Sequence, residues 1–196
     1  MGRPREFDRG EALLKAVDVF WEKGYEATSI QDLVDRMGIH RASLYDTYGN
    51  KHELFTEAMS RYTVLERQAA FAPLAAEGPV KDVLSAFFES IVERISQPDD
   101  RGCLMIKAAM STGSSNGSSN GTSGRQVTEH FKMVDSALRS CLARGKERGD
   151  IRPDTDIDSL AKYLRSALEG LFVSAATGMK RKSLLDIVRW TISTVN

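Results

Sequence analysis

Three helix-start patterns lie close together near the start of this 196-residue chain. In each pattern, a residue that can cap a helix is followed three positions later by an acidic or amide residue, as in a capping box. The three pairs are Asp8–Glu11, Thr28–Gln31 and Asn50–Glu53. Behind them, apolar residues recur at the i, i+3, i+4, i+7 spacing of a core-facing helix. We therefore expect helices over residues 8–24, 28–36 and 41–45, and a longer helix from residue 50 toward residue 65.

The rest of the chain also predicts helix. Apolar stripes at helical spacing cover residues 80–96, 127–148, 156–176 and 183–195, and a short apolar segment spans 103–110. Because no segment has a convincing strand pattern, we expect an all-α fold. We place a small N-terminal domain at residues 1–50 and a larger helical domain at 51–196. Residues 113–124, GSSNGSSNGTSG, predict a mobile loop, with a functional lid as the alternative.

Charge and composition limit the classes of protein to which this chain can belong. The formal net charge is zero, and the first 51 residues hold 8 Lys and Arg against 9 Asp and Glu. Any nucleic-acid contact must therefore depend on where charges are placed, since bulk charge would not attract a polyanion. No apolar run approaches the roughly 20 residues of a membrane span, no secretion signal begins the chain, and only two cysteines are present. We expect a cytoplasmic protein without membrane association.

Two short helices joined by a turn at Gly38 form a helix-turn-helix pattern, whose second helix lies in the DNA major groove. Arg41 can offer a bidentate fork to guanine, and Ser43 can bond to a base or a phosphate. Ala42 keeps the helix surface low, so that the backbone can come close to the groove.

Aromatic and basic residues extend this candidate surface. Tyr45 and Tyr48 can reach phosphates or pack on a thymine methyl group, and Lys51 lies at a helix N-terminus that favours phosphate. The alternative is that Leu44, Tyr45 and Tyr48 form a packing cluster and that the polar residues are a solvated face. Leu44 belongs to the core in either case.

The segment from Thr28 to Leu54 resembles the DNA-binding signature of the tetracycline-repressor (TetR) family. The residues that carry the resemblance, at the family's spacing, are Thr28, Gly38-Ile39, Leu44-Tyr45, Tyr48 and Lys51. Three positions depart from the family pattern: His40 replaces a small capping residue, Ala42 a frequent glycine, and Thr47 a histidine that contacts phosphate in the family. Later segments, beginning with GCLMIKAAM, resemble the ligand-binding and dimerisation half of one subgroup.

This resemblance implies a homodimeric DNA-binding regulator, by family habit a repressor, that binds a palindromic operator and is released by a small molecule. The implied DNA contacts are Thr28, His40, Arg41, Ala42, Ser43, Tyr45, Thr47, Tyr48 and Lys51, with Arg3 and Arg5 of the arm GRPR entering a minor groove. A disordered terminus is the alternative for that arm. Dimer contacts are expected along the last two helices, at Leu160, Leu164, Leu168, Leu171, Leu184, Ile187, Val188, Thr191 and Ile192.

The effector itself is left open by the sequence. The eight candidate pocket residues, each of which also suits a plain core position, are Met59, Tyr62, Phe88, Ile91, Cys103, Met105, Phe131 and Phe172. Cys103 follows Gly102 at an expected helix start, where a thiol pKa can fall. A sensor of oxidants or electrophiles and an inert buried cysteine are both compatible with this position, whereas Cys141 suits the core.

We expect no metal, no cofactor and no catalytic residue. The three histidines lack the spacing of metal ligands, and no Gly-rich phosphate loop follows a strand. Cys103 and His130 could support an enzyme only if the fold brought them together. The remaining alternative is a helical small-molecule-binding or thiol-reactive sensor protein without sequence-specific DNA binding.

Overall fold

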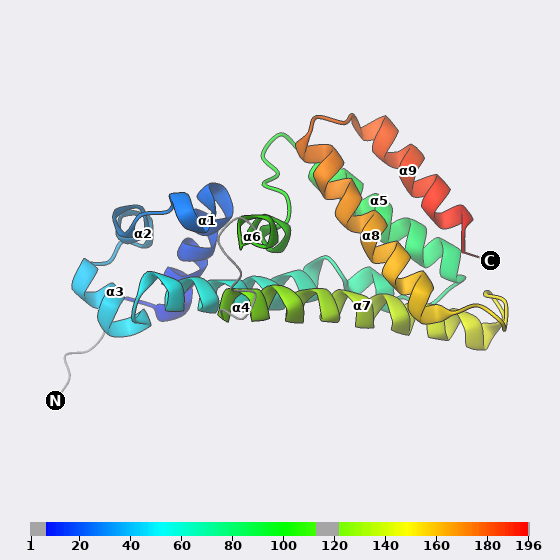
Figure 1. The fold of residues 1–196 in the computed structure, drawn as a ribbon, viewed down its shortest axis with the longest axis horizontal. Coiled ribbons are helices and arrows are strands. Elements are labelled where there is room, and N and C mark those ends of the chain that lie inside the picture. The colour runs from blue at the N-terminus through cyan, green and yellow to red at the C-terminus, as the bar shows by residue number, and fades with distance from the viewer. Residues whose placement is uncertain (1–6, 113–121, 196) are drawn as a thin grey trace. The chain divides into compact units, whose positions relative to one another are not determined.

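The computed structural model describes residues 7–112 and 122–195. Within these ranges the chain forms helices and no strand, which confirms the expected all-α fold (Figure 1). None of the helices in these ranges is both long enough and apolar enough to cross a membrane. The arm at residues 2–5 lies outside the described residues, as does most of the segment 113–124, whose last three residues belong to a helix.

The helices follow one another along the chain with short connections. In order they are α1 (Arg9–Ala27), α2 (Ile30–Met37), α3 (Arg41–Tyr48), α4 (Lys51–Ala69), the 3-10 helix η1 (Ala72–Ala75), α5 (Val80–Ile95), α6 (Leu104–Thr112), α7 (Thr122–Arg148), α8 (Ile157–Ala176) and α9 (Arg181–Ser193). The sequence patterns predicted every α-helix to within a few residues at most ends, but they did not predict η1. Gly24, with φ 76° and ψ 171°, breaks the first helix where the sequence predicts its end, and α1 continues beyond this kink to Ala27.

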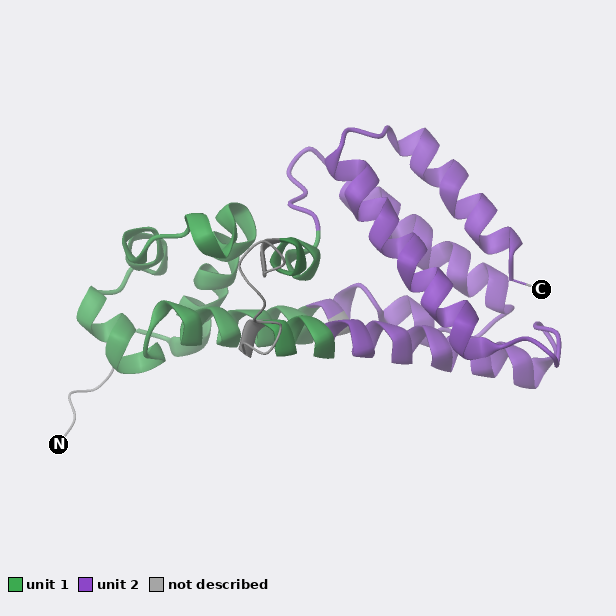
Figure 2. Cartoon of the chain, in the orientation of Figure 1, with its two compact units in different colours: residues 1–65, 103–129 green, residues 66–102, 130–196 purple. Residues whose placement is uncertain are grey.

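Contacts divide the chain into two compact units (Figure 2). Unit 1 comprises residues 1–65 and 103–129, and unit 2 comprises residues 66–102 and 130–196. The domain boundary that we expect near residue 50 stays a prediction, because compactness and function can divide a chain at different places.

Unit 1 is built around α1, which contacts both α2 and α6, while α2 contacts α3. Phe20, Leu33, Leu44 and Leu54 are fully buried and come from α1, α2, α3 and α4. The Phe20 ring meets Phe55 edge-on at a centroid distance of 4.9 Å. Every helix of the helix-turn-helix region thus contributes to one core, which fixes the direction of α3.

Unit 2 contains α5, α8 and α9, each of which contacts the other two (Figure 1). Their apolar stripes face one another inside a single chain. Seven of the nine residues expected at the dimer interface are buried within the single chain, and the interface itself stays a prediction: Leu164, Leu168, Leu171, Leu184, Val188, Thr191 and Ile192. Only Leu160 and Ile187 keep partial exposure.

Candidate nucleic-acid interface

The start of α2 is fixed by Ser29 and Asp32, one residue later than the Thr28–Gln31 pair predicted from the sequence. The Ser29 hydroxyl accepts from the Asp32 amide at 3.1 Å, and the Asp32 carboxylate accepts from the Ser29 amide at 2.8 Å. Thr28 is instead buried, and its hydroxyl donates to the Gly24 carbonyl at 2.6 Å. The Thr28 side chain therefore holds the connection between α1 and α2 and is not exposed to contact DNA.

The turn between α2 and α3 depends on Gly38. Its φ of 70° and ψ of 33° lie in the left-handed region, which glycine adopts without steric cost. The Gly38 amide donates to the Val34 carbonyl at 3.0 Å and so closes α2. His40 then occupies the N-cap of α3, where its exposed side chain forms no capping hydrogen bond with the described part of the helix. Its imidazole is thus available to a partner outside this chain.

The two faces of α3 differ in kind. Leu44 is fully buried, whereas Arg41, Ala42 and Tyr45 are exposed, and Ser43 and Thr47 are partly exposed. On the first turns of the helix, Arg41 offers a guanidinium fork and Tyr45 a phenol. Ala42 between them carries only a methyl group, which keeps the helix surface low. These are the positions and groups with which a recognition helix reads base edges.

Tyr48 departs from the expected DNA contact. Its side chain is 5% exposed, and its hydroxyl donates to the Arg9 carbonyl at 2.6 Å. The Arg9 guanidinium lies 5.2 Å from the centre of the Tyr48 ring. The packing alternative therefore holds for Tyr48, while Tyr45, with 45% exposure, keeps its expected position on the free face.

Lys51 begins α4, as the Asn50–Glu53 capping box predicted. The Asn50 side-chain oxygen accepts from the His52 and Glu53 amides, and the Glu53 carboxylate accepts from the Asn50 amide at 2.9 Å. The Lys51 ammonium lies 4.5 Å from the centre of the Tyr25 ring. This cation–π contact holds the charge at a helix N-terminus, where both the ammonium and the helix dipole favour a phosphate.

Ion pairs brace α1 against α2 on the outside of this region, and the sequence reasoning did not anticipate them. Lys23 pairs with Asp32 at 2.6 Å, and Arg36 pairs with Glu22 at 3.0 Å. The hydrogen bond from Lys23, followed by those from Ser29, holds the pKa of Asp32 well below its usual range. These ion pairs hold α2 in place against α1. Because α3 comes directly after α2 in the chain, they also help to set the position of α3.

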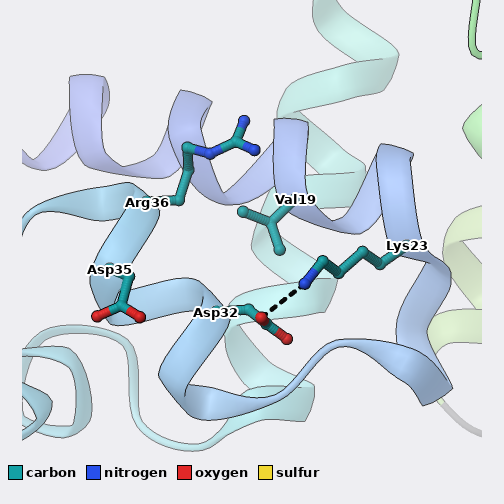
Figure 3. Close-up of a pocket in the computed structure, with 5 residues that line it drawn as sticks. All are labelled: Val19, Lys23, Asp32, Asp35 and Arg36. Atoms are coloured by element: carbon teal, nitrogen blue, oxygen red, sulfur yellow. Dashed lines mark hydrogen bonds and ion pairs between the residues drawn. The ribbon is translucent and has the colours of Figure 1, made fainter.

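Three of these ion-pairing residues border a shallow open pocket, which is lined by Val19, Lys23, Asp32, Asp35 and Arg36 (Figure 3). Its two cations and two acids balance in charge, and Gln31 donates to Asp35 at 2.8 Å. This balance favours a structural role over a site for an anionic ligand. The signal in the sequence was the opposite charges on the facing ends of α1 and α2.

The eight candidate pocket residues divide equally between the units. Met59, Tyr62, Cys103 and Met105 belong to unit 1, and Phe88, Ile91, Phe131 and Phe172 to unit 2. All are buried except Phe131, which is partly exposed. A ligand pocket formed by these residues stays a prediction.

Neither cysteine, both of which lie in described parts of the chain, forms a disulfide. Cys103 directly precedes α6, as expected, and the Tyr62 hydroxyl donates to its Sγ at 3.8 Å. Burial raises the pKa of the Cys141 thiol, as suits a core position. Cys103 belongs to unit 1 and His130 to unit 2, so neither unit contains both members of the conceivable catalytic pair. Among the described residues, no group of His, Cys, Asp and Glu is arranged to hold a metal.

Comparisons with known proteins agree with this geometry. Residues 12–58 match the family described as bacterial regulatory proteins, tetR family, and residues 81–189 match the tetracyclin repressor-like C-terminal domain. The HTH-type transcriptional regulator YezE of Bacillus subtilis is 36% identical over 180 residues, which cover 90% of this chain and 91% of that protein. The HTH-type transcriptional repressor ComR of Escherichia coli is 32% identical over 195 residues, covering 97% and 90%. A solved structure of the TetR family transcriptional regulator CifR, with three cysteines substituted and in complex with a 26-base-pair operator, is 30% identical over the whole of both chains with a TM-score of 0.86.

Proposed function

Because this chain belongs to the TetR family of bacterial regulatory proteins, we propose that it is a cytoplasmic transcriptional repressor. It binds a palindromic operator as a homodimer, and a small molecule releases it. The name of ComR supports repression, and the CifR complex supports operator DNA as the partner.

The exposed face of α3 is the single observation that carries this proposal. Leu44 and Tyr48 anchor the helix from one side, and Arg41, Ala42 and Tyr45 are left exposed on the other. The buried Leu44 and Tyr48 thus hold the exposed Arg41 and Tyr45 in fixed positions. A helix that served only to cover a core would not need an arginine and a tyrosine held in this way. Arg41 is the residue best suited to guanine, because its fork matches the two acceptors of that base.

Dimerisation is proposed through the outer face of α8 and α9, in place of the buried stripes. Tyr163, Ala167, Gly170 and Ser174 share one face of α8 at i, i+4, i+7, i+11 spacing, and each keeps some exposure. On α9, Trp190 is 77% exposed. This exposed indole, on a helix otherwise packed into a core, supports the proposal that a second copy covers this face. Two-fold symmetry then presents two copies of α3 to half-sites about one helical turn apart, or a multiple of that distance.

Release by an effector requires that the ligand bind the DNA-incompetent arrangement more tightly than the DNA-bound one, with a coupling of about 1–3 kcal/mol. The eight candidate pocket residues are the proposed ligand contacts. Arg3 and Arg5 are proposed as additional contacts in the minor groove.

The test is a selection of bound fragments from a genomic DNA library by the purified full chain. We expect a palindromic sequence, and we expect Arg41→Ala to weaken its binding by about 1–3 kcal/mol while relaxing the preference at one base position. Arg152→Ala is the matched control, because Arg152 is an exposed arginine of unit 2 whose loss removes the same charge. Weak binding that is indifferent to sequence and to Arg41→Ala would contradict the proposal and favour a binding protein without an operator.

A further inference from the structure

One partly exposed cation in unit 2, Arg94, lacks hydrogen-bond partners for two nitrogen atoms that are closed to solvent. Arg94 lies in the last turn of α5, and its Nη1 donates to Oε1 of Glu66 at 3.2 Å. The Nε and Nη2 atoms of Arg94 are closed to solvent and have no hydrogen-bond partner among the described residues. Buried donors in folded proteins nearly always have a partner, so this exception calls for a ligand or a water.

The two unpartnered nitrogens form one complete edge of the guanidinium. On this edge an N–H of Nε and an N–H of Nη2 are parallel, which is the fork that binds a carboxylate through two hydrogen bonds. Glu66 bonds to Nη1 and leaves the fork unused. A lysine could balance the charge of Glu66 equally well, but only an arginine provides a second, bidentate edge.

Apolar side chains lie on one side of Arg94, opposite in character to its ion-pair partner Glu66. Phe87 and Ile91 precede it on the same face of α5 at i, i+4, i+7 spacing, and both are buried. The Arg94 guanidinium lies 5.5 Å from the centre of the Phe172 ring on α8. Small-molecule sites combine an apolar lining with a few polar groups that fix the ligand's orientation, and this arrangement has both.

We propose that the Nε–Nη2 edge of Arg94 binds the carboxylate of a small, largely apolar organic acid. Phe172 lies beside the apolar part of that acid. This inference rests on the proposed effector-controlled repressor and names the chemical class of its effector.

The test uses the purified full chain and a series of straight-chain and aromatic monocarboxylates, each paired with the primary amide of the same skeleton. Binding is measured by calorimetry and by the rise in melting temperature that a native-state ligand produces. We expect at least one acid to bind at millimolar concentration and its amide to fail. Arg94→Lys, which keeps the charge but removes the fork, is expected to raise the dissociation constant of that acid at least about tenfold.

Glu66→Gln separates a ligand contact from a merely structural ion pair. It removes a negative charge beside the fork, so acid binding should tighten, whereas Arg94→Lys should weaken it. Equal binding of acids and amides, or a response to Arg94→Lys no larger than to Glu66→Gln, would refute the carboxylate site and leave an internal water as the partner.

Operator binding by the same samples distinguishes failure of the carboxylate site from failure of the proposed repressor function. A wild-type chain that binds its operator but none of the acids overturns the carboxylate site and leaves the repressor intact. A chain that binds an acid through Arg94 but no specific DNA supports the site and overturns the proposed function.

Discussion

The Tyr48 hydroxyl donates a 2.6 Å hydrogen bond to the Arg9 carbonyl and thereby joins the last residue of α3 to the first residue of α1. Arg9 also pairs with Glu57 of α4 at 2.7 Å. The end of the candidate recognition helix is thus held by the same residue that connects α1 to α4. This contact explains why a tyrosine that resembles a DNA contact in sequence is buried in the fold.

Tyr48→Phe is expected to lower the free energy of unfolding by about 1 kcal/mol, because it removes one hydrogen bond and leaves a carbonyl partly unsatisfied. Tyr45→Phe should leave stability unchanged, since the Tyr45 side chain is exposed. Urea denaturation of the two variants measures the difference. In operator binding the order should reverse, with the larger loss for Tyr45→Phe, and an equal effect of both substitutions on stability would contradict this assignment.

Gly49 connects α3 to α4 with φ 76° and ψ −123°, a conformation that other residues rarely adopt. A Cβ placed there would collide with the Glu53 carboxylate, which caps α4. Gly49→Ala should therefore destabilise the chain by about 1–3 kcal/mol. Gly38→Ala is the matched control, because Gly38 also has a positive φ but has open space at its Cβ position. Thermal or urea unfolding should show the smaller loss for Gly38→Ala, and the reverse order would contradict the steric argument.

Apolar periodicity and capping patterns were sufficient to predict the helices but not their exact starts. Thr28 and Ser29 both carry a hydroxyl that can cap α2. Ser29 is the cap because Asp32 can form the reciprocal hydrogen bond with its backbone amide. The capping-box rule looks for Glu or Gln at the third helical position, so it selected Gln31 and missed the shorter acid beside it. At α4 the pair Asn50 and Glu53 satisfied the rule directly, and that prediction is confirmed.

An apolar stripe shows that a helix face is buried, but not what buries it. Leu164 and Leu168 of α8, and Leu184 and Val188 of α9, have the spacing expected of a dimer interface, yet their own chain covers them. The sequence left burial of Tyr48 open for a related reason, because a two-turn helix is too short to show a period and tyrosine suits both faces. In contrast, the exposed residues Arg41 and Tyr45 lie where the helix-turn-helix pattern predicted, since Leu44 fixes the inward face.

Trp190→Glu is expected to convert the proposed dimer into monomers, because it places an unpaired charge on the proposed outer face of α9. Buried aromatic anchors often contribute about 2 kcal/mol or more to an interface, so the dissociation constant should rise at least about thirtyfold. Sedimentation at several concentrations measures the change, and operator affinity should fall with it. Met110→Glu makes the same change at another exposed apolar residue, in unit 1, and should leave the dimer intact. A wild-type chain that sediments as a monomer would reject the proposed interface.

Acid should destabilise unit 2 through His130. This residue is 3% exposed, its ring lies 5.6 Å from that of Phe131, and burial lowers the pKa of His130 from 6.5 to about 4. Between these two values the unfolded chain binds a proton on this histidine and the folded chain does not. Stability therefore falls as the pH drops from about 6.5 to 4, by on the order of 3 kcal/mol in total, and it is unaffected by this group above that range.

His130→Gln removes the titrating group at this position and isolates its contribution from the carboxylates that also titrate in acid. The free energy of unfolding of both proteins, measured by urea denaturation between pH 7.5 and about 4, should give curves that converge as the pH falls. The variant loses packing at neutral pH but lacks the protonation penalty that the wild-type chain incurs in acid. Parallel curves would mean that His130 is protonated as readily in the folded chain as in the unfolded one, and that its burial does not control the acid response.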